Sequence, residues 1–193
     1  MAFTDDFNRA NENLEDSAGW TRVGGAFNAA KIVSNQLEHS SGTNTAFQCT
    51  DQATADHYTQ VVNRETGNHI SFQACTRLTD SSNFFGVKYA TSGTKWEIFK
   101  RDTGSLTSLG SYNAGSIAGG EVVYLKSDAS DVHTFILDGT TRITTSADAF
   151  NSTETRQGVV VRTSSGAWLD DFEAGPLAAG GATILPMMMQ HSN

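Results

Sequence analysis

Two pairs of aspartates, one near each end of the chain, are the residues whose spacing most directly suggests chemistry. Asp5-Asp6 and Asp170-Asp171 both lie beside a phenylalanine on a stretch that alternates like a strand. If the first and last strands pair, these carboxylates approach one another near the edge of the core. Like charges in such a place need a cation, an arginine partner or a shared proton.

One hypothesis for these aspartates is a Ca²⁺ site, because Ca²⁺ is a hard cation that prefers oxygen ligands. Asp5 or Asp6 would bind it together with Asp170 or Asp171 and nearby carbonyls. The alternative is structural: the same side chains cap loop amides or pair with Arg9 or Arg22. Calcium is the one cofactor that the residues suggest.

Recognition of a sugar needs exposed aromatic rings and amides, because rings stack on sugar faces and amides pair with hydroxyls. The candidates in this chain are Tyr58, Gln73, Phe84 and Trp96. Phe84 precedes a second phenylalanine, and both faces of one strand are core only where something covers the outer face. The alternative for each of these aromatic residues is a place in the core of the domain.

Catalytic patterns of other kinds are absent from the sequence. Ser116 lies between glycines, but not at the position of a Gly-x-Ser-x-Gly nucleophile. There is no Gly-Lys-Ser/Thr loop and no His-Glu-x-x-His. The five histidines are scattered along the chain, so we do not expect an enzyme.

Composition excludes further classes of function. The 193 residues include 13 Lys+Arg and 21 Asp+Glu, which gives a net charge of −8. A surface of this charge repels phosphates, so no nucleic-acid partner is expected. No apolar run is long enough to span a membrane, and residues 1–9 do not read as a signal peptide. Cys49 and Cys75 are expected as buried, reduced thiols.

The elements that must position these residues are strands. Serine and threonine make up 42 of the 193 residues and glycine another 18, a composition typical of short strands and turns. Period-2 alternation predicts a strand at each of twelve stretches: 3–8, 31–39, 46–50, 57–63, 70–75, 84–89, 96–99, 122–126, 132–137, 141–145, 158–162 and 168–172. Asp138-Gly139 is a strong hairpin signal. A short helix is expected only within 9–17, capped by Asn8 or Asn11.

The fold class that follows is all-β: a sandwich of two antiparallel sheets with a non-globular tail. The composition changes after Glu173, since no charged residue occurs from 174 to 193 and both prolines lie there. We therefore divide the chain into a domain, 1–174, and a tail, 175–193. The apolar part of the tail, which ends in flexible methionines, is expected to be an assembly element: Ile184, Leu185, Met187, Met188 and Met189.

Several segments together resemble the concanavalin A-like lectin/glucanase jelly roll, in its laminin-G-like branch. They are 5–10 with Leu14 and 19–21, then 32–37, which turns on Ser34-Asn35, and finally 122–126, 134–140, 158–161 and 168–172. The resemblance covers 3–173 and implies that the first and last strands lie near one another. It implies little about function, because this fold hosts lectins, hydrolases, lyases and structural domains.

The enzymatic branches of this superfamily use residues that this chain lacks. Their glucanases carry Glu-x-Asp-x-x-Glu on one strand, whereas Glu97 and Glu121 are isolated here. Their alginate lyases use Gln-x-His and Tyr-x-Lys motifs, of which only Tyr124-Leu125-Lys126 has a loose counterpart.

We therefore predict a non-enzymatic structural or adhesion protein displayed on a large assembly, most plausibly a bacteriophage virion, as capsid decoration, head fibre or tail adhesion component. The expected partners are other subunits, bound through the tail, a cell-surface glycan and further copies of the chain. The expected location is the virion surface or the extracellular space after release. The alternatives are a free-standing carbohydrate-binding module and, less favoured, a glycan lyase or hydrolase.

Overall fold

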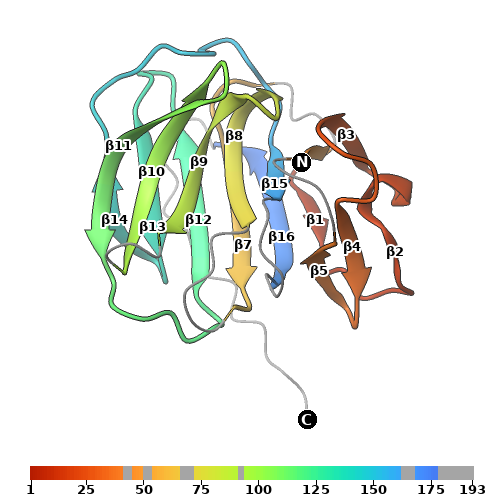
Figure 1. Ribbon diagram of the computed structural model, residues 1–193. Coiled ribbons are helices and arrows are strands. Elements are labelled where there is room, and N and C mark those ends of the chain that lie inside the picture. The colour runs from red at the N-terminus through yellow and green to blue at the C-terminus, as the bar shows by residue number, and fades with distance from the viewer. Residues whose placement is uncertain (41–44, 50–53, 66–71, 91–93, 162–167, 178–193) are drawn as a thin grey trace.

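The computed structural model describes residues 1–40, 45–49, 54–65, 72–90, 94–161 and 168–177. Within these ranges the chain forms two antiparallel sheets that pack face to face (Figure 1). The all-β sandwich predicted from the alternation is confirmed. Among the described residues, no helix has the length and apolarity that crossing a bilayer requires.

The larger sheet has nine strands, in the order β14-β13-β12-β7-β16-β5-β4-β2, with β1 paired to β16. In chain order these strands are β1 (Phe3–Asp5), β2 (Glu12–Asn13), β4 (Ala30–Val33), β5 (Gln36–His39), β7 (His57–Asn63), β12 (Val122–Ser127), β13 (His133–Leu137), β14 (Thr140–Thr144) and β16 (Trp168–Pro176). The first and last strands pair as expected, with Asp5 opposite Phe172. β16 ends two residues beyond the predicted domain boundary at 174.

The smaller sheet has seven strands, in the order β11-β10-β9-β8-β15-β6-β3. In chain order they are β3 (Trp20–Gly24), β6 (Thr45–Cys49), β8 (Phe72–Asp80), β9 (Asn83–Ala90), β10 (Lys95–Asp102), β11 (Ser105–Asn113) and β15 (Gly158–Val161). In Figure 1 the long connection from β14 to β15 passes over one end of the sandwich, at the top of the view.

The hairpin predicted at Asp138-Gly139 is confirmed, and so is the turn expected at Ser34-Asn35. Asp138 and Gly139 join β13 to β14 with φ values of 50° and 73°. Ser34 and Asn35 join β4 to β5 with φ values of 52° and 63°. Two consecutive residues with positive φ form the tight turn whose twist matches that of the flanking strands.

Several local expectations are wrong. The stretch 31–39, predicted as one strand, forms two, β4 and β5, and β3 was not predicted. The predicted helix within 9–17 is one 3₁₀ turn, η1 (Leu14–Asp16), and the preceding Asn13 makes no side-chain cap, so neither Asn8 nor Asn11 caps it. The strand β11 was not predicted, because its two leucines are three residues apart and do not alternate. β11 forms at an edge of its sheet, where most of its side chains meet solvent and burial leaves little pattern.

The main core lies between the two sheets. Trp96 on β10 is 4 % exposed and packs toward Phe135 on β13, with 5.6 Å between ring centroids. Phe85 on β9 stacks on the imidazole of His133 at 3.7 Å. Because side chains alternate along a strand, Phe84 must point to the opposite, outer face of its sheet.

That outer face carries a second apolar cluster, which corrects the expectation that Phe84 is exposed. Phe84 is fully buried and packs edge-on against Phe99, with 5.6 Å between ring centroids. The cluster also contains Ala46, Cys75, Leu78 and Val160. Gly86 lies beneath the two rings, and a Cβ there would approach Phe99 to 2.8 Å and Phe84 to 3.0 Å. Both cysteines are buried thiols outside any disulfide, as predicted.

Candidate functional site

The most distinctive side chain of the domain is the arginine at a bulge of β8. Arg77 interrupts the pairing of β8 with β9 and has a φ of 49°. A bulge bends its strand and turns a side chain in a new direction. Here it turns the arginine toward the loop between β12 and β13, where the side chain is 1 % exposed.

The guanidinium of Arg77 is held by that loop. Its Nη1 donates to Oδ1 of Asp131 at 2.6 Å, and its Nη2 donates to the carbonyl of Asp128 at 2.9 Å. Asp131 itself has a φ of 59°. A buried charge is tolerated where it is paired and hydrogen-bonded, so the loop and the arginine fix one another.

The backbone of Arg77 is held just as closely. Its N–H donates to Nε2 of His57 at 3.0 Å, and its carbonyl accepts from Nδ2 of Asn151 at 3.2 Å. Nδ1 of His57 in turn donates to the carbonyl of Thr54 at 2.7 Å. These contacts define the tautomer of His57, with the proton on Nδ1, and tie three loops to one bulge.

A layer of polar groups lies between the sheets beside this bulge. The hydroxyls of Thr76 and Ser127 are 2.7 Å apart, and Ser127 Oγ lies 2.7 Å from Nδ1 of His133. Burial, and next the nearby guanidinium of Arg77, lower the pKa of His133 to about 4. His133 is therefore neutral at physiological pH, which avoids a second buried cation near Arg77.

A cavity of about 370 Å³ opens between the three loops. It is lined by Thr54, Ala55, Asp56, Arg77, Ala129, Asp131 and Ser152. Hydroxyls and carboxylates thus border an open space of the size that small ligands occupy, with the buried side chain of Arg77 in its lining. No hydrogen bond or ion pair of the Asp56 carboxylate is found among the described residues, so that carboxylate can accept bonds from a ligand.

The predicted aromatic candidates do not form a single platform. Trp96 and Phe84 are buried on opposite faces of the smaller sheet. Tyr58 is partly exposed and stacks on Tyr124 at 5.0 Å, and its hydroxyl donates to Glu173. Burial, and next that hydrogen bond, raise the pKa of Tyr58. The backbone of Gln73 pairs with Val160 in the smaller sheet.

The four aspartates proposed for calcium have protein partners. Asp5 receives Arg9 Nη1 at 2.5 Å and Nη2 at 2.9 Å, together with Trp20 Nε1 at 2.7 Å. Asp6 accepts the backbone N–H of Asn8 at 3.0 Å. These contacts match the structural alternative, amide capping and an Arg9 pair.

The aspartates of the last strand also have an arginine partner. Nη2 of Arg64 lies 3.2 Å from Asp170 and 3.5 Å from Asp171. Burial raises the pKa of Asp170. In the part of the chain that the structure describes, no three histidine, cysteine or acidic side chains converge as a metal site would require.

Sequence reasoning missed the cavity. Asn151 has a φ of 52° and holds the Arg77 carbonyl. Arg77 lies two residues after the alternating run 70–75, and no residue type beside it indicates a bulge. The predicted tail residues, 184–189, lie outside the described residues.

Comparison with known proteins gives matches in structure only. No family model and no curated protein matches the sequence. The carbohydrate-binding module CBM66 from Bacillus subtilis has a TM-score of 0.59 at 16% identity, over 79% of this chain and 91% of the other. The carbohydrate recognition domain of Emp47p has a TM-score of 0.64 at 12% identity, over 94% and 95%.

An enzyme chain is also similar, although only in part. The GH43 protein BlXynB from Bacillus licheniformis (a mutant form) has a TM-score of 0.61 at 14% identity, over 89% of this chain but 38% of its own length. These likenesses establish the fold: the concanavalin A-like sandwich that the sequence resembles is consistent with all three.

Proposed function

We propose that this domain binds a carbohydrate without cleaving it, and that the Arg77 cavity is the binding site. The observation that carries the proposal is the cavity itself: about 370 Å³, bordered by carboxylates, hydroxyls and a guanidinium. Such groups match the paired hydroxyls of a sugar. The fold supports the proposal, because two similar structures are named as a carbohydrate-binding module and a carbohydrate recognition domain.

The lining chemistry favours a sugar without negative charge. Arg77 is the one cation among the lining residues, and its guanidinium already contacts Asp131 and the carbonyl of Asp128. Asp56 adds a carboxylate to the cavity, and the whole chain has a net charge of −8. An acidic sugar would therefore meet repulsion with no spare cation to balance it.

Binding without cleavage is proposed because of what the cavity carboxylates contact. Glycoside hydrolysis needs one carboxyl group to protonate the leaving oxygen and a second to act on the sugar or on water. Asp131 is the ion-pair partner of a buried arginine, which leaves only Asp56 of the lining carboxylates to do either task. Incubation with oligosaccharides should therefore release no new reducing ends.

The binding experiment compares wild type with Asp56→Asn on a glycan array and by calorimetry. The substitution keeps the size of the side chain and removes its charge, so the fold should be retained. We expect affinity for neutral sugars to fall by about tenfold or more, the cost of one charge-assisted hydrogen bond. Asp6→Asn, an exposed carboxylate outside the cavity, is the matched control. Equal affinity of wild type and Asp56→Asn would show that the sugar does not bind in the Arg77 cavity.

A second proposal is that the tail attaches the domain to other subunits of a larger assembly, such as a virion particle outside the cell. The observation that favours it is the uncharged, apolar composition of 174–193. The truncation should fall after Leu177, because β16 runs to Pro176 and the Leu177 N–H donates to the carbonyl of Asp56. We expect the full chain to form oligomers or bind a particle and the truncated chain to be monomeric. Two identical monomers would contradict this proposal.

A further inference from the structure

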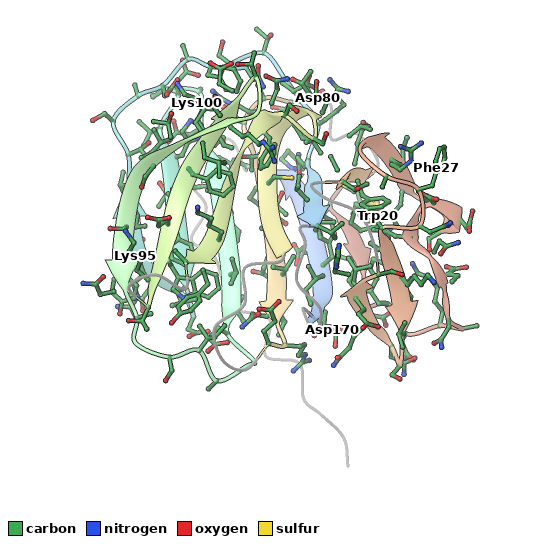
Figure 2. The ribbon with its side chains drawn as sticks, viewed as in Figure 1. Trp20, Phe27, Asp80, Lys95, Lys100 and Asp170 are labelled. Carbon is green, nitrogen blue, oxygen red and sulfur yellow. The ribbon has the colours of Figure 1, made fainter. Side chains whose placement is uncertain are left out.

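The loop between β3 and β4 presents an aromatic ring that no packing requirement explains. Phe27 is 70 % exposed. Figure 2 shows it at the periphery of the lobe formed by the first strands, away from the body of the sandwich. Isolated apolar side chains are common on protein surfaces, so exposure alone carries no inference. The way in which this ring is held is what distinguishes it.

One face of the Phe27 ring is backed by a cation that is itself fixed. The guanidinium of Arg22 lies 3.7 Å from the ring centroid. Its Nη1 donates to the carbonyl of Gly25 at 2.7 Å, and its Nε lies 3.3 Å from Glu15. The ring therefore has a supported face and a free face.

The loop around the ring is fixed as well. Asn28 has a φ of 53°, and its N–H donates to Oε1 of Glu15 at 3.0 Å. The N–H of Ala26 donates to Oγ1 of Thr45 at 2.9 Å. Glu15 thus holds both the arginine behind the ring and the backbone beside it. A ring ordered before binding loses little conformational entropy when a ligand arrives.

We propose that Phe27 is a sugar-stacking platform: the apolar face of a neutral pyranose rests on the free face of the ring, while Arg22 and Glu15 hold the ring from behind. The platform adds a second contact for the ligand class of the proposed function and in that sense rests on it. A protein partner fits less well, since protein interfaces have a continuous apolar core. Among the described residues the exposed large apolar side chains are Phe27, Met1 and Leu106, too few for such a surface.

The experiment titrates cello-, xylo- and fructo-oligosaccharides into wild type, Phe27→Ala and Phe27→Trp. We expect Phe27→Ala to weaken binding about tenfold, the scale of one stacked ring, and Phe27→Trp to retain it. The new tryptophan also reports by difference from wild type, in which Trp20 and Trp96 are buried: bound sugar should protect the added fluorescence from iodide. Leu106→Ala, another exposed apolar residue, is the control.

The two variants, Asp56→Asn and Phe27→Ala, distinguish sugar binding in the Arg77 cavity from sugar binding on the Phe27 ring. If Asp56→Asn abolishes binding and Phe27→Ala does not change it, the cavity stands and the platform is wrong. If only Phe27→Ala weakens binding, the platform stands and the cavity is wrong. If no sugar binds wild type, both are wrong. If Phe27→Ala changes the mass of the protein in solution instead of its sugar affinity, the ring docks a second copy and the platform is overturned.

Discussion

At the scale of single residues, buried polar groups define this domain more than its exposed ones do. Three such side chains are at most 1 % exposed: Arg77, His57 and His133. Each makes hydrogen bonds that hold its side chain in one orientation. Pairing and hydrogen bonds of this kind make buried polar groups tolerable. The titration of His133 is therefore linked to stability.

His133 makes the stability of the domain depend on pH in a defined window. Its pKa is about 4 in the folded chain and about 6.5 when unfolded. The unfolded state therefore binds the proton first, and stability falls as the pH drops from about 6.5 toward 4. Between pH 7 and pH 5 the free energy of unfolding should fall by about 2 kcal/mol from this residue.

The measurement is urea denaturation of wild type and His133→Gln at both pH values. The variant should lose stability at pH 7 because Ser127 and Phe85 lose a partner, but it should lose less between pH 7 and pH 5 than wild type does. The same pH dependence in both proteins would show that His133 does not titrate in this window.

Asp5 is the second residue whose role is structural. Its carboxylate receives both terminal nitrogens of Arg9 and the indole N–H of Trp20, whose ring lies 4.7 Å from that of Phe172. It thereby joins the first strand to the last. Asp5→Ala leaves the buried indole N–H of Trp20 and the two terminal nitrogens of Arg9 without this acceptor, although Arg9 Nε keeps its bond to Glu12. We expect a loss of about 2–4 kcal/mol in the free energy of unfolding.

Asp6→Ala is the matched control, since this exposed neighbour accepts only the N–H of Asn8. Its loss should stay within about 1 kcal/mol. If calcium stabilises the wild type by several degrees in a thermal scan and Asp5→Ala abolishes that shift, the calcium hypothesis is correct and the structural role is wrong.

At the scale of elements, the missing side chain at Gly86 gives the rings of Phe84 and Phe99 room to pack on the outer face of the smaller sheet. Gly86→Ala places a methyl group 2.8 Å from the ring of Phe99 and 3.0 Å from that of Phe84. Overpacking of this kind costs about 1–3 kcal/mol. Chemical denaturation should show that loss, whereas Ser108→Ala on the exposed strand β11 should change stability by less than about 0.5 kcal/mol. A neutral Gly86→Ala would mean that the two rings move apart freely.

Alternation along the chain predicted most of the strands, because in a half-buried strand every second side chain is apolar and faces the core. β7 (His57–Asn63) was predicted with its observed bounds. β11 was missed because an exposed edge strand has no such repeat. The cavity was missed for another reason: it depends on a bulge at Arg77 and on loops from three parts of the chain. The residues of one loop do not indicate which other loops lie beside it in the fold.

The candidate site residues were also predicted from residue type alone, without knowledge of which side chains the fold buries. Trp96 and Phe84 have the aromatic character that a sugar platform needs, but the sheet pairing buries both. Phe27 was not selected, because it lies in a loop between small residues with no alternation around it. Its exposure and its arginine backing follow from the fold of the loop and not from the residues next to it.

At the scale of the whole molecule, the sandwich is a scaffold for two separate candidate sugar contacts, one polar and one aromatic. The cavity lies where loops at one end converge on Arg77, and the Phe27 ring projects from the lobe of the first strands (Figure 2). A ligand that engaged both would gain avidity from two modest contacts. A short sugar would occupy only one of them.

The measurement that tests the central claim most directly is an NMR titration of the domain with neutral oligosaccharides, with the backbone amides assigned. We predict that the largest shifts fall on Thr54, Asp56, Asp131 and Ser152, around the Arg77 cavity. Saturation of those shifts should give the same Kd as calorimetry. Sugar binding that shifts amides only outside these loops would contradict a binding site at the Arg77 cavity. The absence of a saturating shift with any sugar would contradict carbohydrate binding by the domain.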